Sequence, residues 1–183
     1  MSVQASREST VDWRDQIFET LEGHGVRQVY YVPDAGHSKL IQRCQLSNTM
    51  KAIVLTTEEE AMAGALGAWL GGEKAVALMQ SSGVGNCINM LGLSKTLRYP
   101  MLMIITMRGD FGEINPWQYS MGQATPEVLK AMGTMVFEVD RAEDVQATVN
   151  AAANMAFEGQ TAVAVLLKQK LIGAKNFVGK KQP

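Results

Sequence analysis

Six short and continuous apolar runs recur along the 183-residue chain, and they limit its fold more than any other feature. A strand with one solvated face alternates apolar and polar residues, whereas a strand buried on both faces, as in a parallel sheet, is apolar throughout. The runs therefore predict parallel strands. The predicted strands are Gln28–Val32, Ala52–Thr56, Ala75–Gln80, Met101–Met107, Met135–Val139 and Ala162–Leu167.

Segments with the period of an α-helix lie between these runs. Thr10 and Thr125 are residue types that favour helix N-caps, and Pro126 suits a first helical position. The predicted helices are Val11–Glu22, Ser38–Gln45, Glu59–Leu70, Asn86–Leu97, Pro126–Met132 and Ala142–Phe157. The alternation predicts a doubly wound α/β domain, in which helices cover both faces of a six-stranded, mostly parallel sheet.

The composition is that of one globular domain. Hydrophobic residues make up 46% of the chain, and 17 basic against 18 acidic side chains leave a net charge of −1, which excludes the strongly basic character of a nucleic-acid-binding protein. We expect a tail at 1–9, one domain at 10–168 and a basic tail at 169–183. The lysines from Lys168 to Lys181 are expected to be solvated, with docking on a partner as the alternative.

Cysteine usage and hydropathy indicate the compartment. Cys44 and Cys87 are too few and too far apart for a disulfide framework or a metal site. The segment through Ser9 has no apolar core of signal-peptide length, and no stretch reaches the roughly 20 apolar residues of a membrane span. We expect a cytoplasmic protein that binds no membrane and supplies no metal ligands.

Ligands of doubly wound sheets bind beyond the carboxyl ends of the strands. In this chain those ends lead into Pro33–His37, Thr57–Glu60, Ser81–Asn86 and Arg108–Ala124. The last is the longest irregular stretch that we predict, and a loop of more than about 12–15 residues inside a domain is usually functional or disordered. We expect the chemistry to lie in these four segments.

Glu58, Glu59 and Glu60 stand where a strand gives way to a helix. A purely structural role stays open for them, because acidic residues in a first turn stabilise a helix by about 0.3–1 kcal/mol each. Gly64 and Gly67 follow in the same helix, where each glycine costs about 1 kcal/mol relative to alanine. Such small residues indicate that another surface approaches this helix closely.

The segment from Gln80 to Asn86 runs from a strand through a glycine-rich turn into a helix. Gly83 and Gly85 permit close approach to the backbone, and a helix N-terminus attracts anions. The segment has neither the G-x-x-x-x-G-K of a P-loop nor the three-glycine spacing of a dinucleotide site. Neither of those sites is therefore supported.

Arg108 follows the fourth predicted strand and offers a planar fork for an oxyanion. Pairing of Arg108 with Asp110 or Glu113, which would merely order the loop, is an equal alternative. His37 ends another of the four segments. A proton-transfer role for this histidine competes with that of an ordinary loop residue.

Four blocks of these residues together carry a family resemblance. They are T-E-E-E-A-x-A-x-A-x-G from Thr57, M-Q-S-S-G-V-G-N-C-I-N from Met79, R-G-D from Arg108 and M-G-Q-A-T from Met121. In their order and spacing the chain resembles the α subunits of sulfopyruvate decarboxylase, which use thiamine diphosphate. Phosphonopyruvate decarboxylases share the Met79 block, but their arginine loop is similar to R-G-E.

The resemblance implies a pyrimidine-binding domain in which Glu58 is the catalytic carboxylate that contacts the aminopyrimidine ring of the cofactor. A carboxylate there favours the imino tautomer of the ring. Glu59 and Glu60 leave the register of this assignment open by one or two residues. The cofactor wall is expected to contain Gln80, Ser81, Ser82, Gly83, Gly85 and Asn86.

The implied reaction is decarboxylation of a small anionic 2-oxo acid. Arg108, His37 and Gln123 are expected on the substrate side. The substrate that the resemblance favours is 3-sulfopyruvate, which would give sulfoacetaldehyde and CO₂. Phosphonopyruvate or another short 2-oxo acid is an alternative, because a guanidinium accepts sulfonate and phosphonate alike. A non-catalytic regulatory module is another, since fold alone does not imply function.

Thiamine-diphosphate enzymes also carry a Gly-Asp-Gly motif, followed further along by Asn, that holds Mg²⁺ and the diphosphate. Gly109-Asp110-Phe111 is not that motif. The resemblance therefore implies a separate diphosphate-binding β subunit, within a hetero-oligomer whose subunits also self-associate, and an isolated chain without activity. Subunit contacts are expected at Trp117, at Tyr119 and on the small-residue face of the predicted helix Glu59–Leu70.

Overall fold

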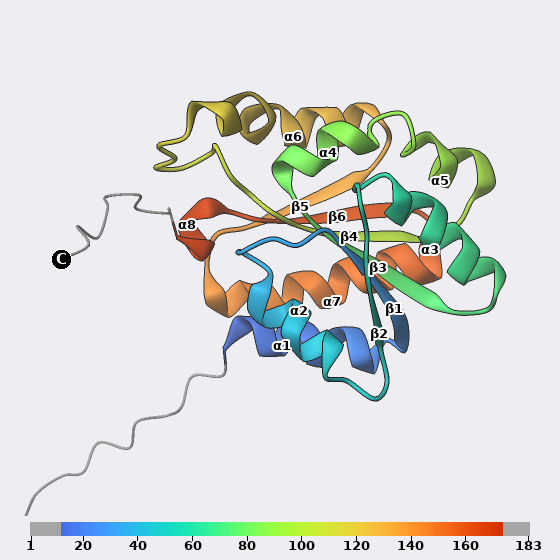
Figure 1. The fold of residues 1–183 in the computed structure, drawn as a ribbon. Coiled ribbons are helices and arrows are strands. Elements are labelled where there is room, and N and C mark those ends of the chain that lie inside the picture. Colours follow the sequence, from blue (N-terminus) through green and yellow to red (C-terminus); the bar gives the residue numbers. More distant parts are fainter. Residues whose placement is uncertain (1–11, 174–183) are drawn as a thin grey trace, which may run out of the picture.

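The computed structural model describes residues 12–173, which form one sheet between two layers of helices (Figure 1). The sheet is parallel throughout, with the strand order β2-β1-β3-β4-β6-β5. Its strands are β1 (Val26–Tyr31), β2 (Lys51–Val54), β3 (Lys74–Gln80), β4 (Met101–Thr106), β5 (Met135–Val139) and β6 (Ala162–Leu167). The predicted doubly wound α/β fold is confirmed, and each apolar run forms a strand.

The helices divide between the two faces of the sheet (Figure 1). One face carries α1 (Trp13–Gly23), α2 (Ser38–Gln45) and α7 (Ala142–Gly159). The other carries α3 (Glu60–Leu70), α4 (Ser81–Cys87), α5 (Gly92–Leu97) and α6 (Tyr119–Ala131). A short 3-10 turn, η1 (Pro116–Gln118), leads into α6, and α8 (Gln169–Ile172) follows the last strand at the carboxyl edge of the sheet.

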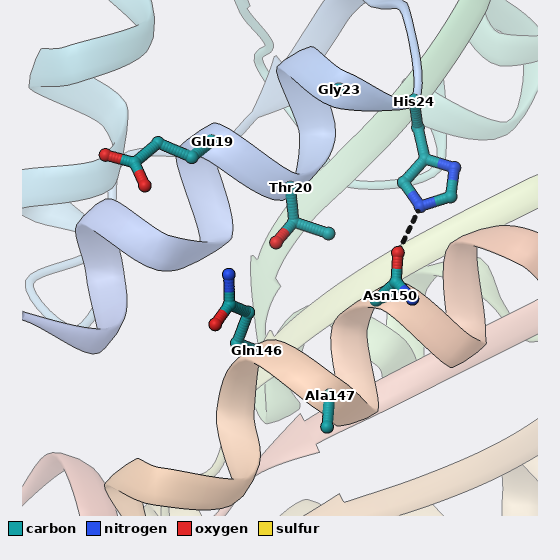
Figure 2. Close-up of a pocket in the computed structure, with 7 residues that line it drawn as sticks. All are labelled: Glu19, Thr20, Gly23, His24, Gln146, Ala147 and Asn150. Atoms are coloured by element: carbon teal, nitrogen blue, oxygen red, sulfur yellow. Dashed lines mark hydrogen bonds between the residues drawn. The ribbon is translucent and has the colours of Figure 1, made fainter.

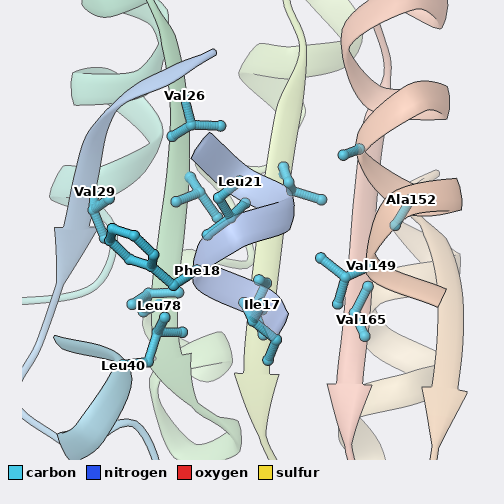
Figure 3. Packing of buried hydrophobic residues seen from close by; sticks show 14 of the residues in the cluster. Ile17, Phe18, Leu21, Val26, Val29, Leu40, Leu78, Val149, Ala152 and Val165 are labelled. Atoms are coloured by element: carbon cyan, nitrogen blue, oxygen red, sulfur yellow. The ribbon is translucent and has the colours of Figure 1, made fainter. Parts of the chain in front are cut away.

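Strands β4 and β6 are buried along their whole length. Successive side chains of a strand point to opposite faces, so each strand supplies both halves of the core. In β4, Leu102 and Ile104 join the cluster under α1 and α7, whereas Met103 and Ile105 join the cluster under α3 and α6. Figure 3 shows the first cluster, with Ile17 of α1 packed toward the sheet. This double burial is why the runs are continuous.

The glycine-rich turn is helical, which corrects the predicted helix Asn86–Leu97. Helix α4 begins at Ser81, and α5 begins only at Gly92, after a turn in which the Leu91 N–H donates to the Cys87 carbonyl. Glycine disfavours helix by about 1 kcal/mol relative to alanine. Here the contacts of Ser81 and Gly83 with other segments, described below, outweigh that preference.

The predicted helix Pro126–Met132 begins seven residues earlier, at Tyr119, so Pro126 lies inside α6. Thr125 is not an N-cap, because its hydroxyl donates to the Met121 carbonyl at 2.6 Å. Gly122 packs so closely that an added Cβ would overlap the carbonyl oxygen of Arg108. These tertiary contacts fix the first turns of α6 and shorten the predicted long loop.

The basic segment after β6 is partly folded. Gln169 is fully buried, and Lys168 pairs with Asp110 and Glu138 at 2.9 Å each. Residues 169–173 therefore pack on the domain, whereas the rest of the predicted C-terminal tail lies outside the described residues. At the other end, Asp12 caps α1 by accepting the Arg14 N–H at 2.9 Å, and the predicted cap Thr10 lies outside the described residues.

Both cysteines are free and buried. Burial raises the pKa of the Cys44 thiol, and likewise that of Cys87, to about 12. Neither thiol is ionised at neutral pH, so neither is a nucleophile.

Candidate functional site

Glu58 and the start of α4 meet beyond the carboxyl ends of β2 and β3. Asn86 Nδ2 donates to Glu58 Oε2 at 2.8 Å. Gly83 lies against the Glu58 side chain so closely that an added Cβ would overlap its Cγ and Cδ. No hydrogen bond within residues 12–173 reaches Glu58 Oε1, and the side chain is half-buried. Oε1, which also lies against Gly83, therefore has no hydrogen-bond donor within the described residues.

The neighbouring carboxylates are engaged within their own segment. Glu59 accepts a hydrogen bond from the Thr57 hydroxyl, and Glu60 Oε2 accepts the Thr56 N–H at 2.9 Å. These bonds organise the start of α3, as the structural alternative for acidic residues in a first turn expects. Within the described chain, the three glutamates thus differ: only Glu58 bonds a side chain from another element.

The close surface predicted for the small residues of α3 is Tyr30 of β1. A Cβ at Gly64 would lie 2.7 Å from the Tyr30 ring, whereas one at Gly67 would meet nothing within 4 Å. Gly64 is therefore required by packing inside this chain. Gly67 is exposed, and its predicted place at a subunit contact stays a prediction.

Asp34 lies after β1 and collects several donors. Its carboxylate accepts from the Thr106 hydroxyl at 2.7 Å, from Gln80 Nε2 at 3.0 Å and from the Gly36 N–H at 3.0 Å. Burial raises the pKa of Asp34, but the hydrogen bond from Thr106, the electrostatic effect of His37 and the hydrogen bonds from Gln80 and Gly36 together outweigh it, so the pKa lies below its ordinary value. The ionised carboxylate fixes the amide of Gln80, whose Oε1 accepts from the Ser82 hydroxyl at 2.9 Å.

His37 points into the core and is 1% exposed. Its Nε2 lies 3.0 Å from the Ile104 carbonyl oxygen, which can only accept, so Nε2 carries the proton. Burial lowers the pKa of His37, against the opposing effect of Asp34, and keeps the ring neutral at pH 7. The structure does not support the predicted substrate contact of His37, and the alternative of a structural loop residue fits its position.

Ser81 and Gln123 hold the backbone of the R-G-D segment (Arg108–Asp110). The Ser81 hydroxyl donates to the Arg108 carbonyl and accepts the Arg108 N–H, at 3.1 Å in both cases. Gln123 Nε2 donates to the Gly109 carbonyl at 2.8 Å. Gly109 has φ of 82°, and a Cβ there would overlap the Gln118 carbonyl. Ser81 is buried, and its predicted cofactor contact stays a prediction.

Arg108 forms the ion pair that was the alternative to a ligand contact. Its Nη2 donates to Glu113 Oε1 at 2.8 Å and its Nε donates to Oε2, with side-chain exposures of 8% for Arg108 and 2% for Glu113. The guanidinium holds the pKa of Glu113 at about 2. Nη1 of Arg108 makes no hydrogen bond within residues 12–173, so a substrate contact stays a prediction.

A small cavity adjoins Arg108, Asp34 and Thr106 and is closed on one side by Ile172 and Gly173. Its volume is about 80 Å³. A water molecule takes about 30 Å³ of the liquid, so the cavity has room for water but not for a thiamine ring.

An apolar surface flanks the site. Phe111, Ile114, Trp117 and Tyr119 are 61%, 53%, 83% and 43% exposed. Trp117 also lines a surface hollow with Ser82, Pro116, Ser120 and Met121. Through this hollow, the exposed Trp117 adjoins Ser82 in the first turn of α4.

A separate groove lies between α1 and α7, where His24 Nε2 meets Asn150 Oδ1 at 2.8 Å (Figure 2). The groove holds none of the predicted site residues. Within residues 12–173 no helix is long and apolar enough to cross a membrane, and no cluster of three or more His, Cys, Asp or Glu is placed to hold a metal ion.

Asp34, Glu113 and Gln169 organise the site, yet the sequence did not single them out for it. Asp34 lies in one of the four predicted segments, so position after a strand was an available signal. Glu113 entered only as an alternative partner of Arg108. Gln169 carried no signal, because it stands in a lysine-rich run that is typical of a tail.

Comparison with known proteins identifies the family of the chain. Residues 11–115 match the family described as thiamine pyrophosphate enzyme, N-terminal TPP binding domain. The chain is 32% identical over 154 residues to sulfopyruvate decarboxylase subunit alpha of Methanococcus maripaludis, covering 84% of this chain and 92% of that one. The corresponding subunit of Methanocaldococcus jannaschii is 31% identical over 151 residues, which cover 82% and 89% of the two chains.

Two further relatives extend the comparison. Phosphonopyruvate decarboxylase of Streptomyces viridochromogenes is 40% identical over 111 residues, which cover 60% of this chain and 28% of that one. A solved 2-oxoglutarate:ferredoxin oxidoreductase from Magnetococcus marinus superposes with a TM-score of 0.67 at 15% identity, over 88% of this chain and 29% of that one. At that identity the superposition shows the shared fold alone.

Proposed function

The chain belongs to the thiamine pyrophosphate enzymes through their N-terminal TPP-binding domain, and from that membership we propose that it is the pyrimidine-binding subunit of a two-subunit decarboxylase. Its substrate class is a small anionic 2-oxo acid. The observation that carries the proposal is the carboxylate of Glu58, which is held by Asn86 over Gly83 with one oxygen unpaired.

The residues around Glu58 fit a pyrimidine ring. Oε1 of Glu58 is placed to accept a hydrogen bond from a ring N–H, while Asn86 steadies Oε2. Gln80 and Ser82 are fixed in one arrangement by Asp34 and supply polar groups to the wall. Thiamine diphosphate, when bound, supplies the electron sink for decarboxylation, and the protein binds and orients it.

A partner subunit completes the site in this proposal. The sequence carries no Gly-Asp-Gly motif, so Mg²⁺ and the diphosphate are assigned to a diphosphate-binding β subunit. The exposed aromatic surface at Trp117 and Tyr119 is the proposed place of contact, since large exposed apolar patches mark interaction sites. The relative from Methanococcus maripaludis is an alpha subunit, which supports this arrangement.

For the substrate we propose 3-sulfopyruvate, which would be converted to sulfoacetaldehyde and CO₂. Three alpha subunits of sulfopyruvate decarboxylases match 84%, 82% and 86% of the chain. Phosphonopyruvate is the second candidate, favoured by the 40% identity over 111 residues to the Streptomyces enzyme. In either case Arg108 is the proposed contact for the anionic end of the substrate.

The test is a substrate panel on the assembled enzyme. The chain is co-expressed with the diphosphate-binding subunit of the same source, and CO₂ release is measured with 3-sulfopyruvate, phosphonopyruvate and pyruvate. We expect kcat/KM for 3-sulfopyruvate to exceed the others at least about tenfold, which equals about 1.4 kcal/mol in transition-state binding. A preference for phosphonopyruvate would select the second candidate. Absence of both turnover and cofactor binding would select the regulatory module.

A further inference from the structure

Gln169, the first residue of α8, lies inside the molecule although it stands among lysines. Its side chain is 0% exposed. Oε1 accepts the N–H groups of Gly109 and Phe111 at 3.1 and 3.2 Å, and Nε2 donates to Glu113 Oε2 at 2.9 Å. The backbone N–H of Gln169 donates to Asp110 Oδ1 at 3.2 Å. One residue from the far end of the chain thus binds the loop after β4 at four points.

The R-G-D segment is therefore held from three sides. Gln169 of α8 binds the N–H of Gly109, and Gln123 of α6 binds its carbonyl. Ser81 of α4 binds both the N–H and the carbonyl of Arg108. Because buried backbone groups need partners, this peptide segment keeps its place only while all three helices do.

Helix α4 connects the R-G-D segment to Glu58. Ser81 is the first residue of α4, Gly83 packs on the Glu58 side chain, and Asn86 donates to its carboxylate. A shift of the R-G-D segment would move Ser81, and with it the surface on which Glu58 rests.

We propose that Gln169 is a positioning residue for the cofactor half-site. It fixes the R-G-D segment, which fixes α4 against Glu58. The proposal deepens the proposed function and rests on it for the cofactor measurement below, whereas the exchange measurement is independent of any activity.

The first test is amide hydrogen exchange on the full chain and on Gln169→Met. Methionine keeps the length of the side chain but removes its strong donor and acceptor. We expect the amides of Gly109 and Phe111 and those of the first turn of α4 to exchange at least about tenfold faster, with β4 and β6 unchanged. Lys170→Ala is the matched control, since Lys170 only forms a surface pair with Asp140 at 3.0 Å.

The second test uses the assembled enzyme. For Gln169→Met we expect the thiamine diphosphate concentration at half-maximal activity to rise at least about tenfold, with kcat at saturating cofactor within about twofold of the parent. A merely structural residue would lower the melting temperature and the amount of active complex, and would leave that half-saturating concentration unchanged. Lys170→Ala is expected to match the parent.

Unchanged exchange at Gly109 and Phe111 would overturn the proposal. Faster exchange with an unchanged half-saturating concentration would overturn the positioning role, and parental turnover in the same series would keep the decarboxylase assignment. A parent complex without turnover would instead refute the proposed function, while the exchange result stands. If Gln169→Met does not fold, Gln169→Asn, one methylene shorter, replaces it in both tests with the same expected results.

Discussion

At the scale of single residues, Glu58 differs from Glu59 and Glu60 in the hydrogen-bond partners of its carboxylate. Glu59 and Glu60 bond groups of their own segment, whereas Glu58 bonds Asn86 of α4 through Oε2, and no hydrogen bond within residues 12–173 reaches its Oε1. The family resemblance favoured Glu58 as the catalytic carboxylate but left the register open by one or two residues, because Glu59 and Glu60 stand next to it. The separation of the three glutamates depends on Gly83 and Asn86, which reach this point only through the fold.

Replacement of Glu58 tests this order. In the assembled enzyme, Glu58→Gln is expected to lower kcat at least about 100-fold, the size of effect that a lost acid–base contact produces, without a change in the melting temperature. Steady-state rates and a thermal melt measure both. Glu59→Gln is the control and should keep the parental kcat. Loss of kcat in Glu59→Gln with a parental kcat in Glu58→Gln would move the assignment by one residue.

The pair of Arg108 and Glu113 predicts a pH dependence of stability. Arg108 depresses the pKa of Glu113 from 4.5 to about 2. The contribution of the ionised Glu113 to the free energy of unfolding is therefore fully present above pH 4.5 and is lost as the pH falls toward 2. Urea unfolding of the isolated chain and of Glu113→Gln should therefore show a stability difference at pH 7 that shrinks between pH 4.5 and 3. A difference that grows in acid would contradict the ion pair.

At the scale of elements, the apolar runs identified all six strands, although only the central strands β4 and β6 are buried along their whole length and the edge strands β2 and β5 are partly exposed. Periodicity misplaced helix starts where tertiary contacts decide them: Ser81 begins α4 in spite of Gly83 and Gly85, and Pro126 lies within α6. The glycine-rich segment was rightly singled out, but as a turn. Glycine in that helix serves the approach of Glu58, which a single sequence does not display.

Two glycine substitutions separate packing from helix propensity. Gly83→Ala is expected to displace the Glu58 side chain, because the added methyl group would overlap it. A displacement of about 1 Å can slow an enzyme about 100-fold, so we expect the activity of the assembled enzyme to fall at least about tenfold. Gly67→Ala, in an open position of α3, should raise the free energy of unfolding of the isolated chain by about 1 kcal/mol. Chemical denaturation and initial rates measure these effects. Parental activity for Gly83→Ala would show that Glu58 has room to move.

At the scale of the whole molecule, the proposed function assigns half of a cofactor site to this chain. Ser82 in the first turn of α4 shares a surface hollow with the exposed Trp117. The sequence predicted Trp117 and Tyr119 as subunit contacts; both are exposed, and the contact itself stays a prediction. The sequence did not predict the contacts between Gln169 of α8 and the loop after β4, because Gln169 becomes buried only when β6 and β4 lie side by side.

If this chain carries only half of the cofactor site, the isolated chain should bind thiamine diphosphate weakly. Calorimetry with thiamine diphosphate and Mg²⁺ should give little heat with the isolated chain, and a dissociation constant at least about 100-fold lower after the diphosphate-binding subunit is added, equal to about 2.7 kcal/mol. Decarboxylation should appear only in the mixture. Tight binding and turnover by the purified chain alone would contradict the two-subunit arrangement.

Because both native cysteines are buried, docking of a partner subunit can be followed with a fluorescent dye on one introduced thiol. Because the thiols of Cys44 and Cys87 have pKa values of about 12 and are shielded, a maleimide dye should leave the native fold unlabelled. A single exposed thiol introduced by Trp117→Cys or Lys170→Cys would then carry the only fluorophore. Docking of a partner over the aromatic surface would be read at the first position, with the second as an internal reference, and no background cysteine would have to be removed.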